Sequence, residues 1–303
     1  MSTPIIRSSL RRRGWWPALV VCALAACSSP APGTLPMNWQ PVAALNAGLP
    51  PGVQVFAGHN PRLPLTAWYV RVREYNPHLT THVVVSGDSD RRETASSFAR
   101  HVGLLMVDSV MTTPPTSSVR RDGLRYPLAR AALGFFGTGS IDVAWTLSRE
   151  NMLQELPRPP AHRPGQPDSL FDPATASHWA VREALAGGPV LVSRGAVNVT
   201  ADQEVFFGTS IPRVHPRTAA GYTVGGDLIL LVVDGRQDGS RGVDLQELAI
   251  LMRNLGCVEA LNLDGGGSST LVVNGQLVNR PAGGTVEREV MSALAVFCGV
   301  GER

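Results

Sequence analysis

The chain has 303 residues, of which 44% are hydrophobic and 17% charged, and its formal net charge is +3. This apolar fraction excludes a disordered or fibrous protein and suffices for one large domain or two small ones. All 27 basic residues are arginine. Schiff-base, P-loop and Ser-x-x-Lys chemistry are therefore excluded, because each needs a lysine.

Residues 1–26 are predicted to be a secretory signal, because four arginines precede an uncharged apolar run too short to span a bilayer. The run ends in Leu24-Ala25-Ala26-Cys27, which resembles a bacterial lipobox, and Cys27 is expected to carry lipid. The alternative is an ordinary signal peptide cut slightly later. Ser28 favours the outer membrane and hence a periplasmic protein. Without residues 1–26 the charge is 3 − 4 = −1, so nothing favours nucleic acid as a partner.

Residues 27–52 are rich in proline, alanine, glycine and serine, and they predict a tether. The globular domain is expected over residues 53–300. Short runs of β type follow the tether, at residues 53–56, 67–72, 82–85 and 104–107, with a short helix candidate at 94–101. The proline-rich stretch 156–173 predicts a surface insertion. Residues 178–185 then predict a helix, and residues 190–192 a strand.

An internal similarity links two segments of the chain. Arg130–Phe135 and Arg217–Tyr222 share the pattern Arg-x-Ala-x-Gly-aromatic. Each is followed by a glycine-containing turn and an apolar run, at 141–145 and 228–233. Two hairpins built alike predict a pseudo-duplicated sheet core, with chance agreement as the alternative.

The C-terminal part predicts strand, helix, strand and hairpin in succession. A helix over 243–255 follows the 228–233 strand, and the next strand covers 258–263. Asn274-Gly275 predicts a hairpin turn, and a last strand covers 292–297. We therefore expect an α+β or mixed α/β fold, with a mixed β-sheet core and flanking helices. Cys257 and Cys298 are equally compatible with a disulfide and with two free thiols.

Asp264-Gly265-Gly266-Gly267-Ser268-Ser269-Thr270 is the strongest functional signal. Successive glycines at a strand end let a ligand approach the backbone amides, and such amides can form an anion-binding concavity. The alternative is a plain glycine-rich turn. A serine hydrolase is disfavoured because the chain lacks Gly-x-Ser-x-Gly, and a zinc site has no support because it lacks Cys-x-x-Cys and His-Glu-x-x-His.

Three motifs together resemble the phosphodiester glycosidase family: Asn262–Pro281, His215–Gly221 and Leu230–Arg236. The resemblance covers about 189–297 and implies hydrolysis of a sugar–phosphate bond, in an envelope glycan or a nucleotide sugar. The family's usual Asn-Gly-Gly-Phe-Phe segment is replaced here by Val107–Met111. Asp108 then adds a carboxylate near the expected phosphate, which implies a different substrate or a weakened site. The alternative function is a catalytically inactive lipoprotein that binds carbohydrate or phosphate.

The resemblance implies three catalytic residues. Asp264 is the nucleophile or general base, with an Asx-turn carboxylate as the alternative. Arg217 grips the phosphate, with a structural salt bridge as the alternative. Asp234 pairs with Asp264 in the manner of glycosidase carboxylates. We expect no metal or cofactor. The alternative is a Ca²⁺ or Mg²⁺ site formed by Asp234 and Asp264, since these ions prefer carboxylate oxygens.

A larger set is predicted to bind the substrate: Asp108, His215, Thr218, Arg236, Asn262, Gly265, Gly266, Gly267, Ser268, Ser269 and Arg280. His215 is a general-acid candidate, although a lone loop histidine is usually structural. Arg236 and Arg280 are weaker candidates that otherwise serve as surface charges. The expected partners are a glycan or sugar phosphate and, through the lipid alone, a membrane.

Overall fold

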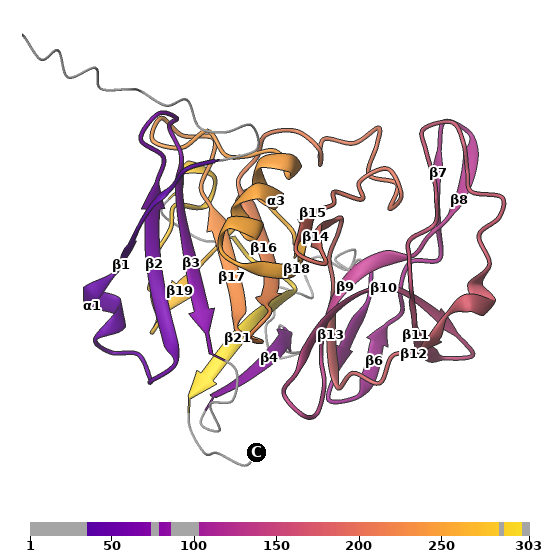
Figure 1. The fold of residues 1–303 in the computed structure, drawn as a ribbon, viewed down its shortest axis with the longest axis horizontal. Helices are drawn as coiled ribbons and strands as arrows, with labels where there is room; N and C mark the ends of the chain where they lie inside the picture. The colour runs from indigo at the N-terminus through magenta and orange to yellow at the C-terminus, as the bar shows by residue number, and fades with distance from the viewer. Residues whose placement is uncertain (1–34, 74–78, 86–102, 285–287, 299–303) are drawn as a thin grey trace, which may run out of the picture. The chain divides into compact units, whose positions relative to one another are not determined.

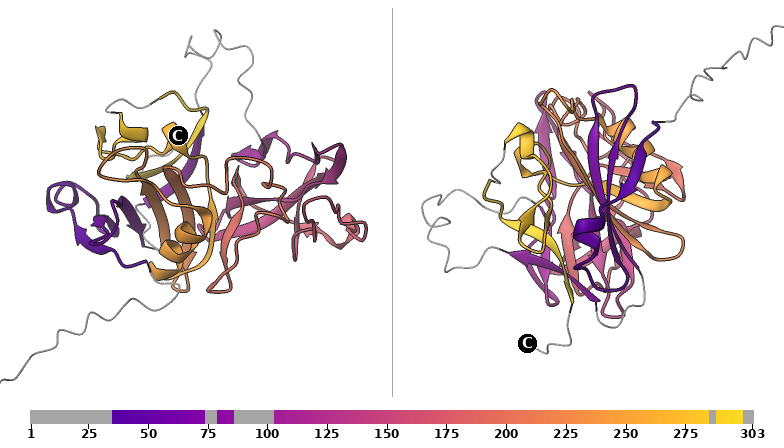
Figure 2. Two further views of the ribbon diagram at one scale, coloured as in Figure 1. Left: turned by 90° about the horizontal axis from the view of Figure 1, so that it is seen from above. Right: turned by 90° about the vertical axis from the view of Figure 1, so that its left-hand side faces the viewer.

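The computed structural model describes residues 35–73, 79–85, 103–284 and 288–298 (Figures 1 and 2). The predicted signal, the lipidated Cys27 and the helix candidate at 94–101 lie outside the described residues. Among the helices of the described ranges, none combines the length and the apolar character needed to cross a bilayer.

Most of the strands in the described ranges belong to two antiparallel sheets. The larger has the order β1-β2-β3-β17-β16-β18-β14-β15, made of β1 (Asn38–Pro41), β2 (Val53–His59), β3 (Thr66–Val72), β17 (Leu228–Val233), β16 (Arg217–Thr223), β18 (Cys257–Asn262), β14 (Val190–Ser193) and β15 (Ala196–Val197). The smaller has the order β12-β11-β10-β9-β13-β5-β6, made of β12 (Ser177–His178), β11 (Met152–Leu156), β10 (Ile141–Arg149), β9 (Arg130–Phe135), β13 (Glu183–Ala186), β5 (Leu105–Val107) and β6 (Val110–Thr113).

Three two-stranded ribbons and two α-helices complete the described elements. The ribbons are β4 (Leu79–Val85) with β21 (Ser292–Cys298), β7 (Ser118–Arg121) with β8 (Leu124–Pro127), and β19 (Val272–Val273) with β20 (Gln276–Leu277). The helices are α1 (Ala43–Asn46) and α3 (Leu245–Asn254), and single 3-10 turns lie at η1 (Pro173–Thr175), η2 (Gly266–Ser268) and η3 (Pro281–Gly283).

The protein is therefore mostly β. The predicted β-sheet core is present, but its pairing is antiparallel rather than mixed, and α3 is the one α-helix of the described ranges longer than four residues. Every strand pair in the described ranges is antiparallel. The predicted β17-α3-β18 succession is present, but α3 carries the chain across β16, which pairs antiparallel with both strands. A strand–helix–strand succession thus does not place its two strands side by side.

Two further local predictions fail. The predicted helix 178–185 is β12, a connection and β13, because β13 pairs with both β9 and β5 and this pairing outweighs helix propensity. Residues 35–52 of the predicted tether join the fold. Leu35 is buried in the core, β1 pairs with β2, and Asn46 of α1 exchanges side-chain hydrogen bonds with the backbone of Val55.

Both hairpins of the internal similarity are present, one in each sheet. β9 pairs with β10 from Arg130–Thr146 to Phe135–Ile141, and β16 pairs with β17 from Arg217–Val233 to Tyr222–Leu228. A third strand adds to each hairpin on the other side, β13 in one sheet and β18 in the other. The residues after these third strands make matching hydrogen bonds of 2.9 Å, Gly187 N–H to Ala131 O and Leu263 N–H to Thr218 O.

Three of the five apolar clusters in the described residues follow the faces of the two sheets. Helix α3 covers one face of the larger sheet with Leu245, Leu248, Ala249, Leu251 and Met252 (Figure 1). A second cluster joins residues of both sheets, including Ala131 and Leu133 of β9 with Ala220 and Leu261 of the larger sheet. A third, around Trp179, covers the far face of the smaller sheet.

The shared glycine of the two hairpins is required by close packing. A Cβ atom on Gly134 would lie 2.5 Å from the Trp179 ring, and one on Gly221 would lie 2.4 Å from the carbonyl oxygen of Glu259. The remaining two cysteines are free thiols. Cys257 is buried and Cys298 exposed, and burial raises the pKa of Cys257 to about 12.

Candidate active site

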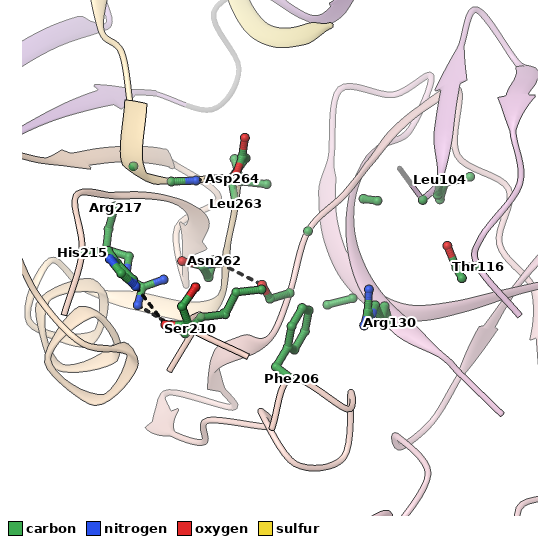
Figure 3. A pocket seen from close by; sticks show the side chains of 18 of the residues that line it. Leu104, Thr116, Arg130, Phe206, Ser210, His215, Arg217, Asn262, Leu263 and Asp264 are labelled. Carbon is green, nitrogen blue, oxygen red and sulfur yellow. Dashed lines mark hydrogen bonds between the residues drawn. The ribbon is translucent and has the colours of Figure 1, made fainter. Parts of the chain in front are cut away.

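A pocket of about 400 Å³ opens where the first residues of the two hairpins meet. Arg130 begins β9 and Arg217 begins β16, and in Figure 3 they lie on opposite sides of the pocket. The 187–188 turn and the Leu263–Gly266 turn also line it. Seven predicted site residues line this pocket: Arg217, His215, Arg236, Asn262, Asp264, Gly265 and Gly266.

Arg217 is mostly committed to holding the backbone around the pocket. Its side chain is buried, with a residue exposure of 3%, and Nε donates to Val243 O at 3.1 Å while Nη2 donates to the carbonyls of Ile211 and Arg213. Burial lowers the pKa of Arg217 to about 10, against the opposing charge of Asp244. The guanidinium stays charged at neutral pH, but its main contacts hold the 211–213 loop in place through hydrogen bonds to backbone carbonyls.

His215 and Arg236 form a hydrogen-bonded pair in the pocket wall. Arg236 Nη2 donates to His215 Nδ1 at 3.1 Å, and His215 Nε2 contacts Ser210 O at 2.9 Å. Arginine can only donate and a carbonyl can only accept, so the partners assign a neutral imidazole with its proton on Nε2. Since both ring nitrogens are engaged, this arrangement does not present His215 as a free general acid.

Asp264 lies at the pocket mouth with its carboxylate toward solvent. Its side chain is 77% exposed, and Oδ2 lies 3.4 Å from Arg288 Nη2. Oδ1 accepts from Gly265 N–H at 2.8 Å, the amide of the next residue, whereas Gly266 N–H, the donor of an Asx turn, bonds to Pro216 O. Asp264 is also the one acidic residue among the described residues that line the pocket.

The glycine-rich turn is explained largely by packing rather than by an open amide nest. Gly266 N–H donates to Pro216 O, while the N–H groups of Ser268 and Ser269 bond within the turn. A Cβ on Gly265 would lie 2.8 Å from Pro216 O, and Gly266 has φ of +64°. Close approach and a left-handed backbone thus require these two glycines. Gly267, Ser268 and Ser269 do not line the pocket.

Asn262 lines the pocket and carries a buried, unpaired side-chain acceptor. Its Nδ2 donates to Gly188 O at 2.9 Å, and the residue is only 5% exposed. Within the described residues, the buried Oδ1 has no hydrogen-bond partner. A buried acceptor without a donor is costly, which sets this oxygen apart from the other polar atoms of the pocket wall.

Asp234 supports the glycine-rich turn from behind and does not line the pocket. Its carboxylate is 2% exposed and accepts from Asn279 Nδ2 at 2.9 Å and from Arg280 N–H. Asn279 Nδ2 also donates to Ser269 O, and Leu271 N–H donates to Asn279 Oδ1. Burial raises the pKa of Asp234. The geometry makes this aspartate a support for the turn, and the Arg280 side chain is exposed outside the pocket.

Thr218 and Asp108 also fall outside the pocket lining. Thr218 Oγ1 donates to Ser269 Oγ at 3.3 Å. Asp108 and Ser109, with φ of 48° and 65°, form the two-residue turn between β5 and β6, a conformation typical of hairpin turns. Asp108 Oδ1 accepts from Arg182 Nη2 at 2.8 Å. The Asp108 carboxylate, expected near the phosphate of the substrate, is thus absent from this pocket. It forms an ion pair with Arg182 at the protein surface.

Sequence reasoning missed three neighbouring residues of the pocket: Arg130, Glu204 and Phe206. Arg130 and Phe206 line it, and Glu204 is fully buried behind them. Arg130 occupies the repeat position that Arg217 occupies in the second hairpin, so the internal similarity could have identified it. Glu204 and Phe206 lie in no motif.

The described residues contain no metal centre built from aspartate or histidine side chains. No group of three or more His, Cys, Asp or Glu side chains gathers there in a way that could hold an ion. Asp234 is saturated by Asn279 and Arg280, and Asp264 faces solvent beside Arg288.

Residues 161–297 match the phosphodiester glycosidase family, which confirms the resemblance found in the sequence. The chain is 34% identical over 139 residues to the SPbeta prophage-derived protein YomE of Bacillus subtilis, covering 42% of this chain and 21% of that one. It is also 34% identical over 109 residues to N-acetylglucosamine-1-phosphodiester alpha-N-acetylglucosaminidase of Bos taurus, covering 33% and 20%. The chain spans about a fifth of the length of these relatives.

Two solved structures share the fold. The zebrafish N-acetylglucosamine-1-phosphodiester alpha-N-acetylglucosaminidase catalytic domain, auto-inhibited by pro-peptide, superposes with a TM-score of 0.53 and 17% identity, over 88% of each chain. A hypothetical protein from Synechocystis gives 0.51 and 17% identity, over 83% of this chain and 64% of that one. At this identity the likeness extends to the fold alone.

Proposed function

We propose that the protein hydrolyses a glycosyl phosphodiester bond. Residues 161–297 match the phosphodiester glycosidase family, which supports this proposal. The observation that carries the proposal is one pocket combining arginines, the unpaired Oδ1 of Asn262 and the carboxylate of Asp264. Arginine suits a phosphate, and the amide oxygen suits a sugar hydroxyl or acetamido N–H. The substrate class is a sugar phosphate of an envelope glycan or a nucleotide sugar.

In this reaction the bond between the anomeric carbon and the phosphate oxygen breaks, and water supplies a hydroxyl to carbon and a proton to the phosphate. Asp264 acts at the sugar side, as nucleophile or as the base that activates water. A phosphate monoester is a good leaving group, because its second pKa is about 6. Stabilisation by the arginines can therefore replace protonation by a second carboxylate, which agrees with the lining of the pocket.

The test uses the purified full chain with UDP-N-acetylglucosamine and with an N-acetylglucosamine-1-phospho-mannoside, and free sugar is measured by chromatography. We expect release by the parent and its loss in Asp264→Asn. Asp122→Asn is the matched control, because Asp122 is an exposed aspartate in the β7–β8 turn, outside the pocket. Equal release by the Asp264→Asn variant would exclude this carboxylate as the reacting group.

A second function is favoured by a specific observation. Arg217 and four amides of the glycine-rich turn, those of Gly265, Gly266, Ser268 and Ser269, are committed to internal hydrogen bonds, which suits a protein that binds a sugar phosphate without cleaving it. Such a protein would show a thermal shift with sugar phosphates and no release of free sugar.

We also propose that the protein is lipidated at Cys27 and held at the outer membrane facing the periplasm. The support is the apolar run with its lipobox-like end in the sequence. Metabolic labelling with a fatty-acid analogue should mark the parent but not Cys27→Ser, and labelling of both would refute the proposed site.

A further inference from the structure

Arg130 and Arg217 occupy equivalent positions of the two hairpins, but fewer nitrogens of the Arg130 guanidinium are engaged in hydrogen bonds. Its Nε donates to the carbonyl oxygen of Glu204 at 3.2 Å. In the described part of the chain, neither Nη group of Arg130 has a hydrogen bond or an ion pair. Arg217, in contrast, gives both Nε and Nη2 to backbone carbonyls.

The ring of Phe206 fixes the plane of the Arg130 guanidinium. Its carbon Cζ lies 4.4 Å from the centroid of that ring, a cation–π distance. Figure 3 shows the two side chains together on one side of the pocket, across from Arg217 and His215. The guanidinium is therefore held from its Nε edge and one face, and its Nη edge remains available.

The segment that holds Arg130 is itself rigidly placed. Val205, between Glu204 and Phe206, has φ of +58° and is fully buried, a strained conformation for a β-branched residue. The Glu204 carboxylate accepts from Ala131 N–H, Val190 N–H, Thr200 Oγ1 and Trp145 Nε1. Strain of this kind persists where the surroundings determine the backbone, as they do at functional sites.

Among the ion pairs of the described residues, none involves Arg130. Burial lowers its pKa, and the nearby Arg121 lowers it further, while Glu204 raises it. The Glu204 carboxylate, however, is occupied by its four neutral donors. A half-buried cation with free N–H groups on a pocket wall is complementary to an oxyanion.

We propose that Arg130 is the residue that binds the phosphate group of the substrate, through its Nη edge, while Glu204 and Phe206 position it and Arg217 serves to hold the 211–213 loop. The assignment rests on the proposed sugar-phosphate ligand. It places the phosphate on the β9 side of the pocket and the sugar toward Asn262, which also lines it.

The test is calorimetric titration of the full chain with N-acetylglucosamine 1-phosphate, inorganic phosphate and uncharged N-acetylglucosamine. We expect Arg130→Gln to weaken binding of both phosphates by about tenfold or more and to leave that of the uncharged sugar unchanged. Arg130→Lys keeps the charge without the fork and should fall between Gln and the parent. The matched control is Arg125→Gln, since Arg125 is exposed and its Nε also makes one hydrogen bond, to Ser118 Oγ at 3.2 Å.

The assignment would be overturned by a phosphate affinity in Arg130→Gln equal to that of the parent, or by an equal loss for the uncharged sugar in a variant with parent-like circular dichroism. A parent that binds neither phosphate would also refute it. A parent that binds the sugar phosphate but releases no sugar would refute the proposed hydrolysis alone and leave the role of Arg130 standing.

Discussion

Replacing Glu204 tests whether its buried carboxylate ties the two sheets together beside the pocket. The side chain is fully buried, and its four donors come from β9, β10, β14 and Thr200. In Glu204→Ala these four donors lose their acceptor. Each buried donor left unpaired costs about 1–3 kcal/mol, but such costs within one network do not add fully. We expect a loss of about 4 kcal/mol, a large part of the roughly 5–15 kcal/mol typical of a folded domain.

Glu204→Gln separates loss of the acceptor from loss of the side chain. Glutamine keeps Oε1, which accepts from Val190, Thr200 and Trp145, but it turns an NH₂ group toward Ala131 N–H where Oε2 accepted at 2.9 Å. One broken hydrogen bond to a charged group predicts a cost of about 2 kcal/mol. Glu150→Ala is the control, because that side chain is 76% exposed.

The assay is urea unfolding followed by circular dichroism, with the free energy of unfolding extrapolated to water. Burial raises the pKa of Glu204, so the folded state binds its proton more tightly than the unfolded state does. The parent's stability should therefore fall as pH rises from the ordinary glutamate pKa through the folded one, and Glu204→Gln should lack this component. The penalty of the Gln variant thus grows as pH is lowered from neutral. An Ala variant within 0.5 kcal/mol of the Glu150→Ala control, by the rough bound for surface substitutions, would refute the reasoning.

Three further predictions concern packing, capping and thiol chemistry. Gly221→Ala should cost about 1–3 kcal/mol of unfolding free energy by overpacking against the Glu259 carbonyl, whereas Gly137→Ala, with nothing within 4 Å, should not; equal urea midpoints would contradict this. Asp244→Ala removes the carboxylate of the capping box of α3 and should cost about 1 kcal/mol in the same assay, and an unchanged midpoint would show that the cap does not stabilise the fold. Iodoacetamide should label Cys298 and spare Cys257 in the folded protein, as measured by peptide mass spectrometry, since Cys257 is buried with a pKa of about 12. Labelling of both at equal rates would show that β18 is open.

The strands with continuous apolar runs were predictable because their signal is local. The predicted 228–233 strand is β17 without change of bounds, and the predicted 243–255 helix contains α3, whose capping box begins at Asp244. The predicted Asn274-Gly275 turn joins β19 and β20, with both residues at positive φ. In each case the residues that determine the conformation are neighbours in the chain.

The residues of the site were only partly predictable. The motif residues Asn262 and Asp264 do line the pocket. The sequence could not show that Arg217 would be engaged by backbone carbonyls, because its acceptors are brought to it by the 211–213 loop. Asp234 is likewise engaged outside the pocket, because its carboxylate accepts hydrogen bonds from the Arg280 backbone and from Asn279, which lies 45 residues later in the chain.

By itself the sequence determined the resemblance to the phosphodiester glycosidase family, the repeated Arg-x-Ala-x-Gly hairpins and the glycine-rich turn, because each is carried by adjacent residues whose identities are fixed in the chain. Only the tertiary structure decided that the hairpins lie in different antiparallel sheets and that their first arginines face one pocket. It also decided that Arg217 gives Nε and Nη2 to backbone carbonyls, whereas Arg130 gives only Nε. That difference depends on the carbonyl groups packed around each guanidinium, and these come from distant parts of the chain whose approach no local pattern specifies.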